Sequence, residues 1–419
     1  MDTEIDSPRP LSLRAPSASI VPHAALYAVQ VLALILPPFR CRNHIFAGLI
    51  VGLAVYTHLH PHFTNDPGLA QPFSIAWSYY LATLAKLLFT GPSGPEGDFW
   101  RIDRPKQEAL GYRALSWQKI RWAFALILNQ RGVRWNHQVK NVHPVQTTKK
   151  SKFLALQTLE FIKCFLIADL LFSLSRRFFF TDANGVVGTI RSDDLTLRHP
   201  DRRWSFAKTL VFAAMPYFML SMQYVQLSIV AVALGISKPE DWPPPFGSIA
   251  DVTTVRLFWG KYWHQQLRHI LTSYTDTVID ALGIPRGTNW SSYTTLYLAF
   301  LLSGTFHALS QRLMPRPEDV SESGLVIGFF LFFVCQAVVI TVEDFGQWCW
   351  RRLRRSQAIG QSRRLARVVG YIWVTWSIWT SLPLAGDTFL RMRMGEENFL
   401  PFSLFGPYVD RFVPIPPPT

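Results

Sequence analysis

The chain has 419 residues, of which 49% are hydrophobic, 14% aromatic and only 17% charged, and long apolar runs recur from Ile20 onwards. This composition excludes an ordinary soluble domain and predicts an all-α, polytopic integral membrane protein. The formal net charge of +14 lies in blocks between the apolar runs, which is typical of cytosolic loops and predicts no nucleic-acid partner.

The start of the chain predicts a retained anchor. Asp2, Glu4 and Asp6 stand where a cleavable signal would carry basic residues, so the first apolar run is expected to remain in the protein. The four cysteines of the chain show no C-x-x-C spacing. We therefore expect neither a disulfide framework nor a metal site.

The lengths of the apolar runs predict about eight transmembrane helices of roughly 20 residues each, together with re-entrant or interfacial helices. The predicted spans are Ile20–Pro38, Ile45–His60, Leu69–Thr90, Phe153–Ser175, Ala207–Ile236, Tyr293–Ser310, Gly324–Phe345 and Val369–Gly386.

Loop charge predicts the orientation of these spans. The segment Gly91–Lys152 holds twelve basic residues against four acidic ones, and Gly346–Val368 holds seven arginines and no acidic residue. Both loops are expected to face the cytosol. Within the first loop, Leu115–Leu128 predicts either a helix lying in the membrane interface or a buried helix of a loop subdomain.

A proline-rich loop leads into a segment dense in aromatic and basic residues. The run Asp241–Gly247 contains three consecutive prolines, which forbid a regular helix, and the absence of further prolines before Pro285 predicts a helix from Val255. A membrane-interface belt and a lined cavity both fit this helix, and its polar groups favour the cavity. Its polar and aromatic side chains are Arg256, Trp259, Lys261, Trp263, His264, Gln265 and Arg268.

One histidine stands in the apolar run Tyr293–Ser310. His307 follows Ser303 and Gly304, two small residues that allow a neighbouring helix or a substrate to approach closely. An ionisable residue at membrane depth indicates a functional site, and a core histidine hydrogen-bonded to a neighbouring helix is the alternative. As a neutral imidazole, His307 could accept a proton.

Two other groups of ionisable residues suggest chemistry less strongly. The alternating histidines of His58–His62 are interrupted by a proline and predict a loop or interfacial segment rather than a metal site. Glu160, Lys163 and Asp169 lie in the predicted fourth span. They could neutralise each other on one helix face or form a proton relay in a transporter.

Three motifs taken together resemble a known family. They are WPPPFGS at Trp242–Ser248, RLFWGKYWHQ at Arg256–Gln265 and SGTFHA at Ser303–Ala308. This combination looks like the signature of the wax-synthase-like branch of the membrane-bound O-acyltransferase superfamily, which in fungi is similar to acetyltransferases that decorate terpenoids and meroterpenoids. The resemblance implies that His307 is catalytic. It also implies that His264 stands where other branches have an asparagine after tryptophan.

The resemblance further implies an all-helical membrane fold around a catalytic tunnel, forming one domain over residues 1–419 with its motif core at about 241–310. The implied reaction moves an acyl group, with acetyl favoured, from acyl-coenzyme A to a hydroxyl of a lipophilic terpenoid-type alcohol in the endoplasmic reticulum membrane, without a bound cofactor. A wax-ester synthase is the alternative, and a proton-coupled transporter is a more distant one.

The same implied reaction assigns roles to the remaining motif residues. Basic side chains near the histidines could pair with coenzyme A phosphates, and the aromatic and polar ones would line the substrate site. The basic residues are Arg256, Lys261 and Arg268, and the lining residues are Trp259, Trp263, Gln265 and Gly304.

Overall fold

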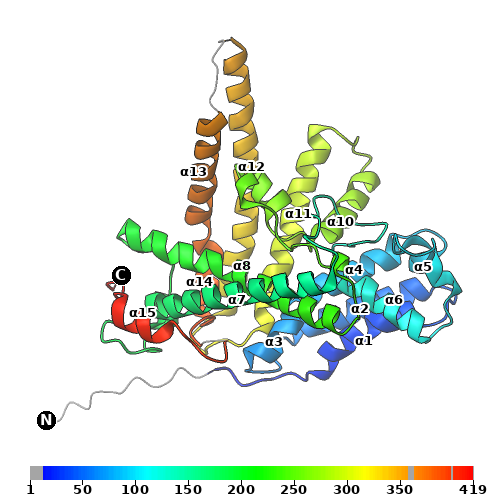
Figure 1. Cartoon of the computed structure of the whole chain (residues 1–419), viewed down its shortest axis with the longest axis horizontal. Helices are drawn as coiled ribbons and strands as arrows, with labels where there is room; N and C mark the ends of the chain where they lie inside the picture. Colours follow the sequence, from blue (N-terminus) through cyan, green and yellow to red (C-terminus); the bar gives the residue numbers. More distant parts are fainter. Residues whose placement is uncertain (1–12, 357–362, 398–399, 419) are drawn as a thin grey trace.

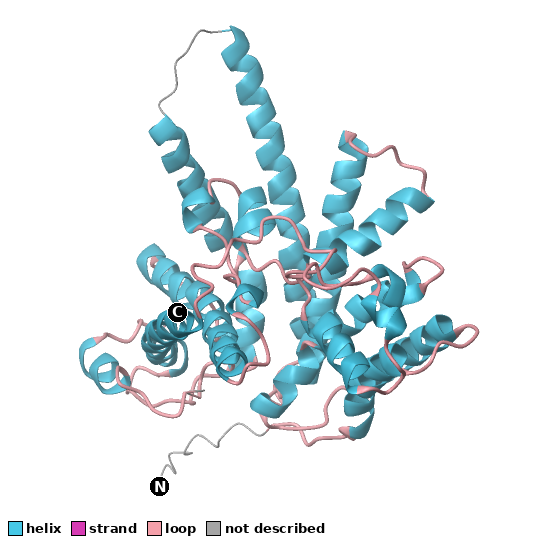
Figure 2. Cartoon of the chain, turned by 45° about the vertical axis from the view of Figure 1, so that its right-hand side comes forward, coloured by secondary structure: helices cyan, strands magenta, loops and turns pink. Residues whose placement is uncertain are grey.

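The computed structural model describes residues 13–356, 363–397 and 400–418. All regular elements in these ranges are helical, and no strand occurs there, as the absence of strand colour in Figure 2 shows. The predicted all-α class is confirmed. The acidic residues Asp2, Glu4 and Asp6, on which the prediction of a retained anchor depends, lie outside the described residues.

The helices follow one another along the whole described chain, with short 3₁₀ and π turns between some of them (Figure 1). The first six are α1 (Val21–Ile35), α2 (Arg42–Leu59), α3 (Pro67–Ser74), α4 (Ala76–Leu88), α5 (Gly94–Asp98) and α6 (Trp117–Leu128). The next five are α7 (Lys150–Ser175), α8 (Arg202–Ala233), α9 (Val255–Leu257), α10 (Arg268–Ala281) and α11 (Asn289–Ser310). The last four are α12 (Glu322–Ser356), α13 (Arg363–Ser381), α14 (Pro383–Arg391) and α15 (Gly406–Phe412).

Several helices begin at side chains that accept a hydrogen bond from a free backbone N–H of the first turn. Asp66 accepts from Gly68 N at 2.7 Å and starts α3, and Ser116 accepts from Lys119 N at 3.3 Å and starts α6. Thr288 caps α11 in the same way. These local signals determine where the helices start but not how they pack.

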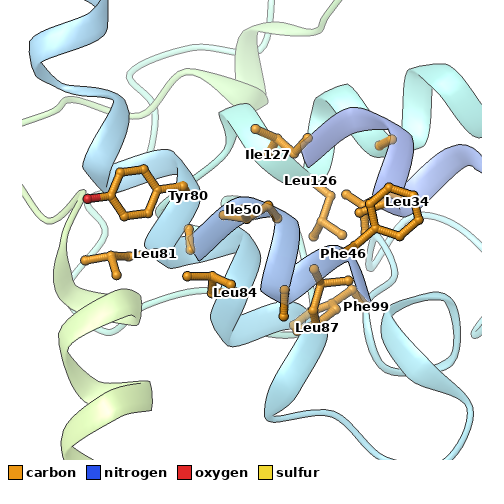
Figure 3. Close-up of a cluster of buried hydrophobic side chains, with 14 of the residues drawn as sticks. Leu34, Phe46, Ile50, Tyr80, Leu81, Leu84, Leu87, Phe99, Leu126 and Ile127 are labelled. Atoms are coloured by element: carbon orange, nitrogen blue, oxygen red, sulfur yellow. The ribbon is translucent and has the colours of Figure 1, made fainter. Parts of the chain in front are cut away.

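The largest buried core lies between α1, α2, α4 and α6 (Figure 3). Leu34, Ile50 and Leu126 are fully buried in it, and Trp135 and Ile270 join it from a loop and from α10. Helix α6 buries one face, which includes Trp122, in this core. Elsewhere α7 packs along α8, and α11 packs against both α10 and α12. The hairpins α10–α11 and α12–α13 project from the same side of the molecule (Figures 1 and 2).

The structure does not show eight membrane spans. Among the described residues, two helices are long and apolar enough to cross a membrane, Arg202–Ala233 and Glu322–Leu353. A third span is possible if α13 and α14, bent by 43°, act as one. All eight predicted segments coincide with helices, but Leu69–Thr90 is divided at Ile75, and α1 has only 15 residues. One face of α1, α2 and α4 packs into a shared core, whereas α2 leaves Ile45, Leu49 and Val55 exposed.

The predicted loop Gly346–Val368 is also mostly helical. Helix α12 continues to Ser356, and α13 begins at Arg363. The described residues of this segment therefore continue two helices beyond their apolar parts.

Candidate active site

The proline-rich loop is held by one buried arginine that the sequence analysis counted only as loop charge. Arg131 is 6% exposed and donates to the carbonyl oxygens of Pro244 at 2.6 Å and Pro243 at 2.8 Å. It also donates to the Tyr224 hydroxyl at 2.8 Å, and that hydroxyl donates to Pro243 O at 2.7 Å. Two distant segments, the loop after α6 and helix α8, thus set the position of the loop.

The continuous helix predicted from Val255 is wrong. Helix α9 has only three residues and is followed by η6, a π-helical turn over Phe258–Tyr262, after which Trp263 is extended. The buried Glu343 of α12 accepts from Val255 N at 2.7 Å and from the indole N–H of Trp373 at 2.8 Å, and this anchors the turn. Side-chain spacing could not predict this break, because the anchoring carboxylate is distant in the sequence.

Three of the residues predicted to bind substrate already form an ion pair or hydrogen bonds with other residues of the protein. Arg256 forms an ion pair with Asp344 of α12. Arg268 donates to the backbone oxygen of Gly260 at 2.7 Å and to the side chain of Gln265 at 2.9 Å. Gln265 is 5% exposed and donates to Trp263 O at 2.9 Å. These contacts hold the turn and the loop after it in place.

Lys261 differs from those three. It is exposed and makes no ion pair with any residue in the described ranges. Its side chain borders a cavity of about 200 Å³, whose lining includes Asn141, His143, Ser248 and Tyr262. The structure therefore leaves this lysine free to meet an anionic group at the surface.

The environment of His307 determines which ring nitrogen carries the proton. Nδ1 lies 2.8 Å from the backbone oxygen of Ser303, one helical turn earlier, and 3.2 Å from the Ser303 hydroxyl. A carbonyl oxygen can only accept, so Nδ1 carries the hydrogen and Nε2 keeps its lone pair. The ring stacks on Phe333 with centroids 4.6 Å apart, and the edge of Trp77 meets it at 4.8 Å.

An aromatic chain connects His264 to His307. His264 contacts Trp263, with ring centroids 5.5 Å apart, and Trp263 contacts Trp259 at 6.2 Å. Trp259 lies 5.9 Å from Phe333, the ring that stacks on His307. His264 also contacts Phe246 of the proline-rich loop that Arg131 holds, with ring centroids 6.2 Å apart. Its buried Nδ1 has no hydrogen-bond partner in the described part of the chain.

The structure thus brings the two predicted histidines together, along with residues that the sequence analysis did not single out. Trp77 and Phe333 contact the His307 ring, and the fully buried Gln336 accepts from the Trp259 indole N–H at 3.2 Å. Gln336 offered one signal in the sequence, because it is an amide with apolar residues on both sides, from Phe329 to Ile340 apart from Cys335. The aromatic residues offered none, since such residues are common throughout these helices.

Gly304 contacts a neighbouring helix. A Cβ atom built on it would lie 2.9 Å from Cβ of Phe333 and 3.4 Å from the backbone oxygen of Phe330. Its lack of a side chain therefore lets α11 approach α12, which was one of the two possibilities left open by the sequence. This close approach is what places Phe333 against His307.

The other ionisable groups singled out in the sequence have partners within the protein. His58 lies 3.1 Å from the Tyr80 hydroxyl, and no set of three potential ligands placed to hold a metal occurs among residues 13–356, 363–397 and 400–418. Glu160 and Lys163 form an exposed pair at 2.6 Å. Asp169 is fully buried and accepts from the backbone N–H of Leu404 at 2.7 Å, so it fastens the C-terminal segment.

Comparisons with known proteins cover this site. Residues 242–335, which contain the proline-rich loop, both histidines and Phe333, match the family described as "Membrane bound O-acyl transferase family". Residues 149–233 match the family described as "Aspirochlorine biosynthesis protein F C-terminal domain". The first match contains every predicted site residue.

Similar proteins occur in fungi. The chain is 41% identical over 225 residues to aspirochlorine biosynthesis protein F of Aspergillus oryzae, covering 54% of this chain and 88% of that protein. It is 30% identical over 299 residues to acetyltransferase eriL of Hericium erinaceus, covering 69% of this chain and 71% of that protein. It is 29% identical over 385 residues to acetyltransferase sirH of Emericella nidulans, covering 89% of this chain and 84% of that protein. The chain therefore belongs to the membrane-bound O-acyltransferase family and is an acyltransferase.

Proposed function

We propose that this enzyme transfers an acetyl group from acetyl-coenzyme A to a hydroxyl of a lipophilic, terpenoid-type secondary metabolite, as a multi-pass protein of the endoplasmic reticulum. The names of the relatives, several acetyltransferases and one biosynthesis protein, support the acetyl group and a role in biosynthesis. The observation that carries the proposal is the Nδ1–H of His307 donated to Ser303 O, which leaves Nε2 available as a base.

The reaction follows from that free nitrogen. Nε2 of His307 takes the proton of the acceptor hydroxyl while the hydroxyl oxygen attacks the thioester carbonyl. The carbon–sulfur bond breaks, coenzyme A leaves as a thiolate, and His307 returns the proton to the sulfur. The hydrogen bond to Ser303 and the rings of Phe333 and Trp77 hold the imidazole in one orientation during both proton transfers.

His264 supplies the second part of the mechanism. Its unpartnered ring nitrogen is buried beside the catalytic chain of aromatic rings, so as an N–H it can donate to the oxyanion that develops on the thioester carbonyl. Among the described residues, the buried guanidinium of Arg131 is hydrogen-bonded only to neutral oxygens, so its charge adds to this stabilisation. Lys261, at its cavity, meets the phosphates of the donor from the cytosolic side.

The test uses the purified full-length enzyme with labelled acetyl- and palmitoyl-coenzyme A and a panel of terpenoid and fatty alcohols. We expect His307→Ala to lose at least ~10²-fold in turnover, which is the contribution of a positioned base. His264→Asn should keep more activity than His264→Ala, because the amide still donates a hydrogen bond. The exposed His44→Ala is the matched control and should behave as wild type.

The outcomes separate the parts of the proposal. Near-normal turnover in His307→Ala would remove this residue from the chemistry. Equal losses in the two His264 variants would remove its role as a donor. Transfer of palmitoyl in preference to acetyl, to fatty alcohols, would replace the proposed reaction with wax-ester synthesis.

A further inference from the structure

The largest apolar core contains polar side chains that the proposed reaction does not use. Lys86, near the end of α4, is 1% exposed, and its ammonium has no hydrogen-bond partner among the described residues. Trp135 is 2% exposed with an equally unpartnered indole N–H, and both ring nitrogens of His137 are buried without a partner in the described part of the chain. Buried polar atoms are nearly always paired, so this concentration is unusual.

These side chains lie close together. The rings of His137 and His269 have centroids 4.9 Å apart, and the Trp135 ring lies 5.8 Å from His137. Burial, followed by the charge of Lys86, lowers the pKa of the His269 imidazole to about 4 and also lowers the pKa of His137. Leu84 and Leu87, which flank Lys86 on α4, pack in the same buried core as Trp135, so the lysine and the rings share one region of the protein.

No carboxylate balances this lysine. Lys86 forms no ion pair with any described residue, whereas Lys119, which is 4% exposed in the same core, is 2.9 Å from Glu96. Glu96 also forms an ion pair with Arg42 at 2.7 Å, so its single negative charge already pairs with two cations. An unpaired cation in an apolar core lowers the stability of the fold, and residues that are kept despite such a cost are often functional.

We propose that Lys86, Trp135 and His137 form an anion site that takes a phosphate group. The ammonium comes from α4, and the indole N–H and the imidazole N–H come from the loop after α6. A phosphate has enough acceptor oxygens to pair with all three donors while its charge compensates the lysine. The phosphate can belong to coenzyme A, in which case the site rests on the proposed function, or to a lipid head group or free phosphate. These sources share the same chemistry at the site.

The first experiment measures thermal unfolding of the detergent-purified full chain in inorganic phosphate and in chloride at equal ionic strength. Wild type should gain roughly 2–4 °C from phosphate over chloride. Lys86→Met should have a higher melting temperature without phosphate, because an unpaired cation is removed, and should lose the phosphate-specific gain. Lys119→Met is the matched control: it breaks a buried ion pair, so it should melt lower and keep the gain.

A Lys86→Met variant that responds to phosphate as wild type does would overturn the proposal, as would one that melts lower than wild type. If that variant does not fold, Trp135→Phe removes the indole N–H while keeping an aromatic ring at this position. It should weaken the apparent affinity for phosphate roughly 10-fold. An unchanged affinity in Trp135→Phe would equally overturn the site.

Further arms identify the source of the phosphate. A larger shift with coenzyme A than with dephospho-coenzyme A, abolished in Lys86→Met, assigns the site to the donor. A Lys86-dependent shift in nanodiscs with phosphatidate assigns it to a lipid, and a response to inorganic phosphate alone assigns it to the free anion. Because melting needs no turnover, His307→Ala should keep every shift, so failure of the proposed reaction and failure of the anion site are distinguishable.

Discussion

Replacing Gly304 with alanine tests whether the contact between α11 and α12 positions the catalytic ring. A Cβ at this position would lie 2.9 Å from Phe333 Cβ, whereas carbon atoms pack comfortably at about 3.5–4.0 Å. Helix α12 must therefore retreat by roughly 0.5–1 Å, or the Phe333 side chain must turn. Both changes alter the ring that stacks on His307 at 4.6 Å.

The expected effects on stability and on activity differ in size. Overpacking costs about 1–3 kcal/mol, and alanine in place of glycine within a helix returns about 1 kcal/mol, so unfolding should become easier by only about 0–2 kcal/mol. A catalytic group displaced by about 1 Å can lose ~10²-fold in rate. We expect Gly304→Ala to reduce kcat by roughly 10- to 100-fold while the melting temperature falls by a few degrees at most.

The assay compares kcat, KM and thermal unfolding of Gly304→Ala with those of Gly346→Ala. Gly346 lies in α12, and nothing lies within 4 Å of the position its Cβ would occupy, so its replacement should stabilise the helix slightly and leave kcat unchanged. Wild-type kcat in Gly304→Ala would refute the idea that this contact positions His307. A collapse of stability with no folded enzyme would show that the helix contact cannot relax as described.

Two more predictions concern buried charges. Glu96→Gln should destabilise the protein by about 3–5 kcal/mol at pH 7, since it leaves the cations of Arg42 and Lys119 unmatched. Burial alone would raise the pKa of Glu96, but hydrogen bonds and charges from those two residues hold it below its usual value. The ionised form of Glu96 therefore stabilises the fold above pH about 4.3, and this stabilisation is lost as the pH falls through the folded-state pKa. Thermal unfolding of wild type and Glu96→Gln from pH 7 to 3 should show the difference in stability between the two proteins shrinking. A constant difference would contradict this prediction. Arg131→Lys should keep the positive charge but lose most of the hydrogen bonds to Pro243 and its neighbours. We therefore expect kcat to fall roughly 10-fold while KM for the acceptor stays nearly unchanged. Equal kcat in wild type and Arg131→Lys would mean that the geometry of the guanidinium group is unimportant.

Local features of the chain were readable from the sequence. The lengths of the apolar runs predict helices, and all eight predicted spans coincide with helical segments. The hydrogen bond that orients His307 is also local, because Ser303 lies four residues earlier on the same helix. The three motifs led to the family, which the comparisons then established.

Tertiary packing decided the rest. Run length does not tell which face of an apolar helix packs against the rest of the protein. The structure shows that α2 and α6 turn Ile50 and Leu126 into a shared core, which agrees with the buried alternative for α6. The partners of Arg256 and Arg131 lie 88 and about 112 residues away in the chain, and no spacing rule connects such positions. Which cation is balanced and which remains unpaired, as Lys86 does among the described residues, depends on these long-range contacts, because charge compensation acts through distance in space rather than separation along the chain.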